Sequence, residues 1–136
     1  MSAVRRVLFL CTGNSCRSQL AEAITNARFP VWRAYSAGVR PAGTVHPMTS
    51  RVLQEIGIEH QGVSKSVEDF RDQEFDLVVT VCDDANEECP VWSGQGRRLH
   101  QSFLDPASVE GTDAERLAIF RQVRDQIYKK LPQILS

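Results

Sequence analysis

Apolar residues along the chain form short continuous runs that are separated by segments with helical spacing. The runs at 7–10 and 75–81 are almost entirely apolar or β-branched, which is typical of parallel strands buried on both faces. A further strand is predicted over 31–37, ended by Gly38, and a more polar strand over 97–100 suits an edge of the sheet. Four strands are therefore expected.

Between these runs, apolar residues recur every three or four positions, which predicts helices. In the first helix Leu20, Ile24 and Ala27 are expected to share a buried face. A second helix is predicted over 46–57, with proline in its first turn and glycine at its end. The last helix begins behind a Thr-x-x-Glu capping box at 112–115.

Strands that alternate with helices predict an α/β fold, in which a four-stranded parallel sheet is flanked by helices on both faces. A short helical turn is expected at 66–70, before the third strand. The length of 136 residues suits a single domain, 1–136. Ligands of such sheets bind beyond the carboxyl ends of the strands, so Cys11 and Cys82, which follow the first and third strands, are expected at one edge.

The composition excludes several classes of function. Apolar residues make up 42% and charged residues 24% of the chain, and the net charge of −1 predicts no basic surface for nucleic acid or an anionic membrane. No apolar run reaches transmembrane length, and the run after Arg5 and Arg6 is too short for a signal peptide. Nucleotide-binding fingerprints are absent from the sequence, so no such cofactor is expected. We therefore expect a cytoplasmic protein.

The segment 11–18, Cys-Thr-Gly-Asn-Ser-Cys-Arg-Ser, is the strongest indication of chemistry. It joins a strand to a helix N-terminus, where backbone N–H groups and the helix dipole favour an oxyanion. Arg17 supplies a planar fork for two oxygens of a phosphate-like group. The positive surroundings favour a Cys11 thiolate, to which the Ser18 hydroxyl is placed to donate a hydrogen bond. The residues expected to bind the oxyanion are Thr12, Gly13, Asn14, Ser15, Cys16 and Arg17.

The chain has four cysteines, which in a reducing compartment are more often catalytic or redox-active than structural. Their spacings do not match those of zinc ligands, so no metal is expected. Cys16 is expected to pack rather than react. If the residues between Cys82 and Cys89 were helical, the two would be separated by about 10 Å of rise, so a disulfide would require this segment to loop out. We hypothesise that it is a redox switch.

Three of these thiols suggest a relay in which Cys11 attacks, Cys82 resolves the adduct and Cys89 carries the disulfide outward. Asp105, which precedes a proline on the same loop side of the sheet, is expected to protonate an oxygen that leaves the oxyanion, as a general acid. The sequence therefore predicts nucleophilic cysteine chemistry on a tetrahedral oxyanion.

The segment 11–18 resembles the oxyanion loop shared by low-molecular-weight protein tyrosine phosphatases and thioredoxin-coupled arsenate reductases. The resemblance extends over the start of the chain through Glu22, then 35–38, 76–90, 105–106 and the final helix. Phosphatases of this fold typically have Asp-Pro-Tyr where this chain has Asp-Pro-Ala at 105–107. That difference, together with the Cys82/Cys89 pair, makes the likeness one to the reductases.

The resemblance implies that the protein reduces arsenate to arsenite and that this reaction serves to detoxify arsenic. Cys11 would attack arsenate held by the loop amides and Arg17, while Asp105 assists the loss of an oxygen. Cys82 would then release arsenite and leave a Cys11–Cys82 disulfide, and Cys89 would form a Cys82–Cys89 disulfide that thioredoxin reduces. The spacing of Cys82 and Cys89 favours thioredoxin over glutathione with glutaredoxin without deciding between them.

Some relatives bind a potassium ion near the loop through an Asn, a Glu, a Ser and an Asp. Asn14, Glu22 and Ser36 match the first three positions, but the fourth falls at 64–66, where the sequence is Ser-Lys-Ser. We hypothesise that the ammonium group of Lys65 takes the place of the cation.

Two other functions share the same loop. A phosphatase would hydrolyse phosphomonoesters through a Cys11 phosphoenzyme and would not need Cys82 or Cys89; weak activity of this kind is expected even in a reductase. A carrier or phosphate sensor would only hold the phosphoryl group, and Arg17 and Asp105 argue against it.

Overall fold

The computed structural model describes residues 4–83, 92, 94 and 96–136. Within them the chain forms four strands, three α-helices and two 3-10 helices. In chain order these are β1 (Arg5–Cys11), α1 (Arg17–Arg28), β2 (Trp32–Gly38), α2 (Pro47–Gln54), η1 (Val67–Phe70), β3 (Leu77–Thr80), β4 (Arg97–His100), η2 (Pro106–Ser108) and α3 (Asp113–Ile134).

The strands form one parallel sheet in the order β2-β1-β3-β4. β1 is central, since Leu8 pairs with Tyr35 of β2 on one side and with Val78 of β3 on the other. Leu10 is in register with Thr80, so β1 and β3 end at nearly the same level. The predicted four-stranded parallel sheet is confirmed, and the residues that follow β1 and β3 lie together at the C-terminal ends of the strands.

β1 is buried on both faces, as its continuous apolar sequence predicts. Val7 and Phe9 pack in the core beneath the helices, whereas Leu8 and Leu10 pack in a second cluster on the opposite face. All four side chains are 0% exposed. Burial of one such side chain contributes about 1.5–3 kcal/mol to the stability of the fold, so packing on both faces fixes the position of β1 and of the start of the loop that follows it.

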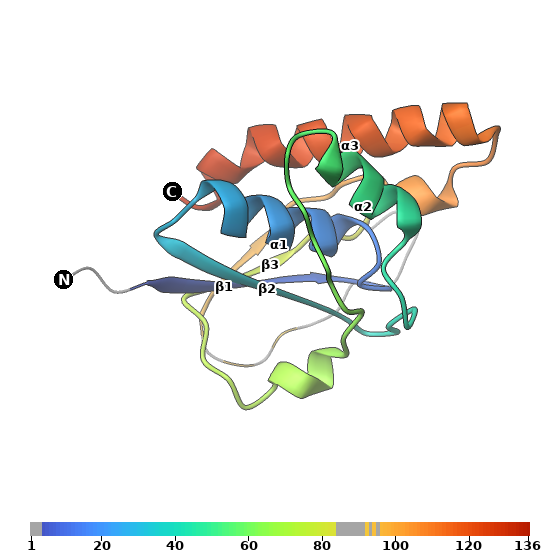
Figure 1. Cartoon of the computed structure of the whole chain (residues 1–136). Helices are drawn as coiled ribbons and strands as arrows, with labels where there is room; N and C mark the ends of the chain where they lie inside the picture. The colour runs from blue at the N-terminus through green and yellow to red at the C-terminus, as the bar shows by residue number, and fades with distance from the viewer. Residues whose placement is uncertain (1–3, 84–91, 93, 95) are drawn as a thin grey trace.

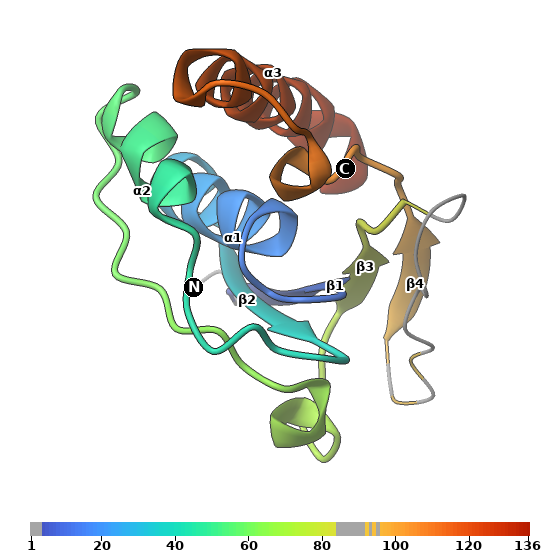
Figure 2. The ribbon, with the colours of Figure 1, turned by 90° about the vertical axis from the view of Figure 1, so that its right-hand side faces the viewer.

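The two faces of the sheet are covered unequally (Figures 1 and 2). On one face α1 and α3 lie with α2 packed beside them, and Leu20, Leu53 and Phe120 of the three helices share one core. On the other face, η1 brings Phe70 beside Phe75, against Leu8 and Leu10 of β1. Helical elements therefore cover both faces, as predicted, with a single turn on the second face within the described residues.

The predicted elements need two corrections. Leu20 and Ile24 are buried as predicted, whereas Ala27, on the same face near the end of α1, is exposed because neighbouring elements do not cover that end of the helix. The second helix ends at Gln54, before Gly57. Gly57 has a left-handed φ of 77°, and the chain around it tightens into a turn that a regular helix cannot continue through.

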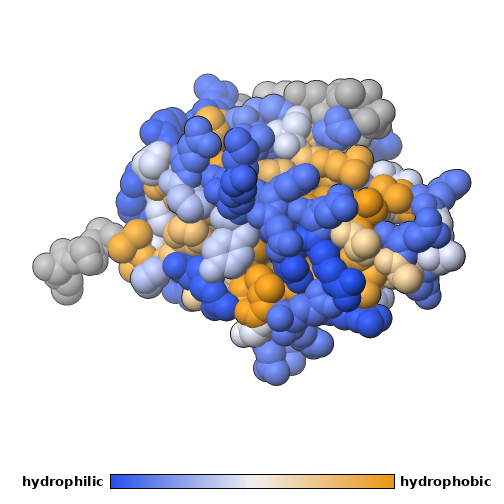
Figure 3. Space-filling model, turned by 90° about the horizontal axis from the view of Figure 1, so that it is seen from above, coloured by the Kyte–Doolittle hydropathy of each residue, from blue (hydrophilic) through white to orange (hydrophobic). Residues whose placement is uncertain are grey.

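No helix within the described part of the chain is long and apolar enough to cross a membrane. Seen from above, the surface is mostly hydrophilic, with hydrophobic residues in smaller areas between the hydrophilic ones (Figure 3).

Candidate active site

The loop between β1 and α1 is held from outside through its carbonyl oxygens. Segments distant in the sequence donate hydrogen bonds to three of these oxygens. The pairs are Arg40 N–H to Thr12 O, Ala42 N–H to Gly13 O, His46 N–H to Ser15 O, Thr49 hydroxyl to Ser15 O and Ser64 hydroxyl to Gly13 O, at 2.9–3.1 Å. The carbonyls are therefore turned away from the centre of the loop.

This arrangement turns backbone N–H groups inward. The C=O and the following N–H of a trans peptide point in opposite directions, so outward carbonyls of residues 12, 13 and 15 direct the N–H groups of Gly13, Asn14 and Cys16 toward the centre. The Asn14 N–H accordingly donates to Cys11 Sγ, at 3.3 Å. Asn14 also has a left-handed φ of 50°, which reverses the chain ahead of α1. The loop thus forms a cradle for an anion at a helix N-terminus.

Cys11 Sγ lies 2.8 Å from Ser18 Oγ, and neighbouring groups fix the direction of this hydrogen bond. The Lys65 backbone amide donates to Asn14 Oδ1 at 2.7 Å, so Asn14 Nδ2 faces Ser18 Oγ, at 2.8 Å. An amide nitrogen can only donate, so Ser18 Oγ accepts from Asn14 and its own hydrogen is available to Cys11. Cys11 Sγ then accepts two hydrogen bonds, one from the Ser18 hydroxyl and one from the Asn14 N–H.

Arg17, at the start of α1, and Asp105, at the start of η2, lie beside each other. The Arg17 side chain is 3% exposed, and its Nη1 donates to the carbonyl of Phe103 at 3.2 Å. Its Nη2 lies 3.8 Å from Asp105 Oδ2. Asp105 Oδ1 accepts from the Ala107 N–H at 3.0 Å, which caps η2. The carboxyl group is therefore oriented beside the guanidinium, while its side chain remains 35% exposed.

The remaining cysteines differ in their surroundings. Cys82 follows β3, is fully buried and takes part in a disulfide bond, whereas Cys11 and Cys16 are free thiols. Burial raises the pKa of the Cys16 thiol to about 12, so Cys16 stays protonated near neutral pH, in agreement with a packing role. Cys89, and with it most of the predicted redox switch, lies outside the described residues.

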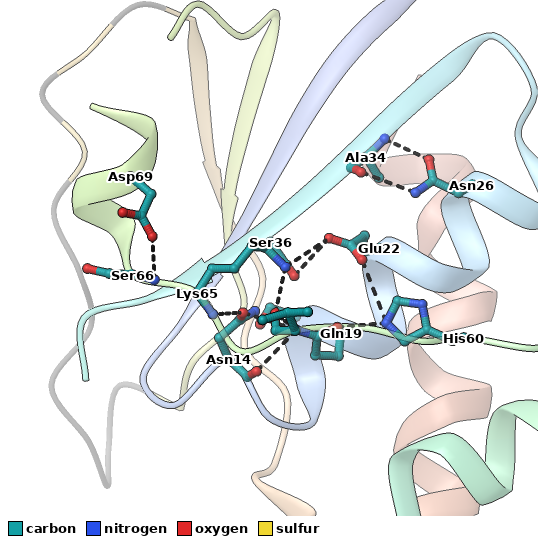
Figure 4. A network of polar contacts seen from close by, with 12 residues as sticks. Asn14, Gln19, Glu22, Asn26, Ala34, Ser36, His60, Lys65, Ser66 and Asp69 are labelled. Carbon is teal, nitrogen blue, oxygen red and sulfur yellow. Dashed lines mark hydrogen bonds and ion pairs between the residues drawn. The ribbon is translucent and has the colours of Figure 1, made fainter. Parts of the chain in front are cut away.

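Glu22 stands where a potassium ligand was expected, and it is surrounded by protein groups (Figure 4). Its Oε1 accepts from the Ser36 hydroxyl at 3.0 Å and lies 3.7 Å from Lys65 Nζ. Its Oε2 lies 3.6 Å from His60 Nε2. Asn14 Oδ1 already accepts from Lys65 N–H and from Gln19 Nε2, which uses both lone pairs of that oxygen. These residues do not fit a potassium ion, and the Lys65 ammonium supplies the positive charge beside Glu22.

Sequence reasoning missed Gln19, His60 and the steric role of Gly38. Gln19 is 0% exposed and bonded to Asn14, and the available signal was a polar residue within a buried helical stripe. A Cβ on Gly38 would lie 2.4 Å from Thr12 O and 2.9 Å from Asn14 N, so only glycine lets β2 approach the loop this closely. Burial lowers the pKa of His60, which therefore remains neutral near pH 7.

The sequence matches the low molecular weight phosphotyrosine protein phosphatases over residues 6–136. The chain belongs to this family. Among its relatives, the arsenate reductase of Halalkalibacterium halodurans is 45% identical over 130 residues, which covers 92% of this chain and 91% of that protein. The resemblance to the arsenate reductase branch of the family is thereby confirmed.

Solved structures of arsenate reductases share the fold of this family member. A structure described as an arsenate reductase in the phosphate binding state has a TM-score of 0.74 and 28% identity, over 95% of each chain. The thioredoxin-dependent arsenate reductase of Corynebacterium glutamicum has a TM-score of 0.67 and 27% identity, over 98% of this chain and 63% of that one.

Proposed function

We propose that this protein is an arsenate reductase that uses Cys11, Cys82 and Cys89 as a three-thiol relay and thioredoxin as its reductant. The observation that supports it most strongly is the environment of Cys11. Its sulfur accepts from Ser18 and Asn14 at the base of a cradle of inward N–H groups, and Arg17, the residue after this loop, has its guanidinium beside Asp105. This arrangement suits a thiolate attacking an oxyanion of arsenate or phosphate type.

In the first step the Cys11 thiolate attacks the arsenic atom of arsenate. The N–H groups of residues 12–17 and the Arg17 fork hold the remaining oxygens and the charge on them. One oxygen departs as water after Asp105 donates a proton to it, and a Cys11 sulfur–arsenic(V) bond remains. Asp105 is placed for this role because its carboxyl group lies beside the Arg17 guanidinium, which is expected to bind the anion. Its Oδ1 accepts from the Ala107 N–H, so Oδ2 is the oxygen left to carry the proton.

The next two steps move the disulfide outward. The Cys82 thiolate attacks Cys11 Sγ, the sulfur–arsenic bond breaks, and its electron pair reduces arsenic(V) to arsenic(III), which leaves as arsenite. Cys89 then attacks Cys82 Sγ and releases the Cys11 thiolate. The dithiol of thioredoxin supplies two electrons and two protons to the Cys82–Cys89 disulfide, which restores the enzyme. A cytoplasmic location is proposed because this reductant operates there.

A phosphatase is the second candidate, and a specific observation favours it. The cradle, Arg17 and Asp105 satisfy the needs of phosphomonoester hydrolysis through a Cys11 phosphoenzyme, and neither Cys82 nor Cys89 enters that reaction. We propose that hydrolysis is a weak side activity, because Ala107 follows Asp105-Pro106 where an aromatic residue would contact an aryl substrate.

The deciding experiment measures arsenate-dependent NADPH oxidation with thioredoxin and thioredoxin reductase, in wild type and in Cys89→Ser. Hydrolysis of para-nitrophenyl phosphate by the same preparations is the internal control, because it tests the cradle without the relay. We expect reductase turnover to fall below a hundredth of wild type in Cys89→Ser while hydrolysis survives.

Other outcomes separate the alternatives. Brisk hydrolysis without any arsenate-dependent NADPH oxidation would make the protein a phosphatase. Reduction that proceeds with glutathione and glutaredoxin but not with thioredoxin would contradict the proposed reductant and leave arsenate as the substrate.

A further inference from the structure

Gln19, in the first turn of α1, is a fully buried polar residue with no part in the mechanism above. Its Nε2 faces three oxygens: Asn14 Oδ1 at 3.0 Å, Asn14 O at 3.2 Å and Val63 O at 3.0 Å. Its Oε1 lies 2.7 Å from His60 Nε2. All the polar atoms of this side chain are therefore engaged (Figure 4).

These contacts permit one orientation of the Gln19 amide. Three acceptors surround the nitrogen position, so an amide turned by 180° would place oxygen against oxygen at each of them. With Oε1 fixed as the acceptor, His60 Nε2 must carry a hydrogen. Neutral and protonated His60 both satisfy this requirement, so the orientation of Gln19 does not depend on the charge of the ring.

The orientation is passed on to Cys11 through Asn14 and Ser18. Gln19 Nε2 and the Lys65 N–H both donate to Asn14 Oδ1, which keeps Asn14 Nδ2 against Ser18 Oγ. If the Asn14 amide turned over, its oxygen would accept the hydrogen of Ser18, and Cys11 would lose that donor. Gln19 also bonds the Asn14 carbonyl, where the backbone is left-handed.

We propose that Gln19 is a positioning residue for the nucleophile: by holding both oxygens of Asn14, it keeps the hydrogen of Ser18 directed at the Cys11 thiolate. The proposal deepens the proposed function, because it rests on Cys11 as the nucleophile. It does not require that arsenate be the substrate.

The test measures the rate at which iodoacetamide alkylates Cys11 at a series of pH values between about 5 and 9.5. Peptide mapping identifies the alkylated cysteine at each pH. The variant Gln19→Met removes the amide and keeps the length of the side chain. We expect alkylation at pH 7 to slow about three- to tenfold, with the profile displaced to higher pH and the rate at its upper end unchanged, since fewer molecules carry the thiolate. Gln19→Glu, which matches the shape of glutamine, is expected to slow alkylation at pH 7 as well.

Two comparisons separate positioning from a general loss of structure. Thr25→Val alters another fully buried polar residue of α1 that lies away from the loop, and it is expected to leave the alkylation profile unchanged. In a Ser18→Ala background, Gln19→Met is expected to slow alkylation less than twofold further, because its effect passes through Ser18.

Either of two results would overturn the proposal. One is a pH profile of Cys11 alkylation that is unshifted in both folded Gln19 variants. The other is a slowing of alkylation by Gln19→Met that is as large in the Ser18→Ala background as in wild type. Because alkylation needs no arsenate turnover, a failure to reduce arsenate leaves this test intact. A wild-type Cys11 that does not react at all would instead reject the proposed nucleophile.

Discussion

Gly38→Ala is the substitution for which the structure predicts the largest effect from the smallest change. The new Cβ would lie 2.4 Å from Thr12 O, about 1 Å short of ordinary contact, and 2.9 Å from Asn14 N. Neither neighbour is a flexible side chain, because both atoms belong to the backbone of the oxyanion loop. Gly38 itself is tied down, since its N–H donates to Lys65 O at 2.9 Å. The loop must therefore move.

The expected magnitudes follow from that displacement. Overpacking of this kind costs about 1–3 kcal/mol of stability. A misplacement of roughly 1 Å at reacting groups reduces catalysis by about 10²-fold, because the N–H groups and Cys11 no longer fit one anion. We expect kcat/KM for arsenate reduction, and for para-nitrophenyl phosphate hydrolysis, to fall together by that factor, with urea unfolding shifted to lower concentration.

Gly57→Ala is the matched control. Gly57 has φ of 77°, so alanine there costs about 1–2 kcal/mol of left-handed strain, but the nearest atom to its new Cβ is an Arg28 nitrogen at 4.0 Å. Its stability should fall comparably while its kcat/KM stays within about twofold of wild type. Wild-type activity in Gly38→Ala, or an equal loss in both variants, would refute the steric argument.

Three further predictions concern charged and buried groups. Lys65→Ala removes the positive charge beside Glu22 and should lower the reaction rate without making it respond to replacement of sodium by potassium salts; a potassium stimulation of either protein would contradict the role of the ammonium group. Hydrogen bonding from Arg121 lowers the pKa of Glu55 from 4.5 to about 2, so its stabilising effect is present above pH 4.5 and lost as the pH falls toward 2. The destabilisation by Glu55→Gln in urea should accordingly shrink between pH 7 and about pH 3, and a constant difference would count against the ion pair. Because burial raises the pKa of Cys16 to about 12, iodoacetamide at pH 8 should modify Cys11 well before Cys16 in folded protein, and peptide mapping that finds the reverse order would contradict this burial.

The elements that could be predicted are those whose signal is local. The apolar run of β1, the capping box of α3 and the edge strand at 97–100 each depend on residues close in sequence, and each appears in the structure. The strand-to-helix loop with Cys11 and Arg17 was recognisable for the same reason.

The groups that support the loop could not be predicted, because their partners lie far away in the chain. Gln19 contacts His60 across 41 positions, and Lys65 contacts Asn14 across 51. Asp105 was assigned to the loop side of the sheet, but its contact with Arg17 depends on η2, which its own side chain caps. Ala27 was misplaced because helical spacing indicates a face without showing how far neighbouring helices cover it.

The hydrogen bonds that turn the loop carbonyls outward come mostly from backbone groups rather than from side chains. At positions 40, 42 and 46 the donor is a backbone amide, which every residue except proline supplies. Side chains at 40 and 42 are therefore not specified by the anion cradle that their backbone supports. Both positions are exposed, so substitutions there can change the surface beside the loop while these backbone hydrogen bonds are kept. Selectivity and catalysis can then change independently, which is consistent with one family uniting proteins described as phosphotyrosine phosphatases and as arsenate reductases.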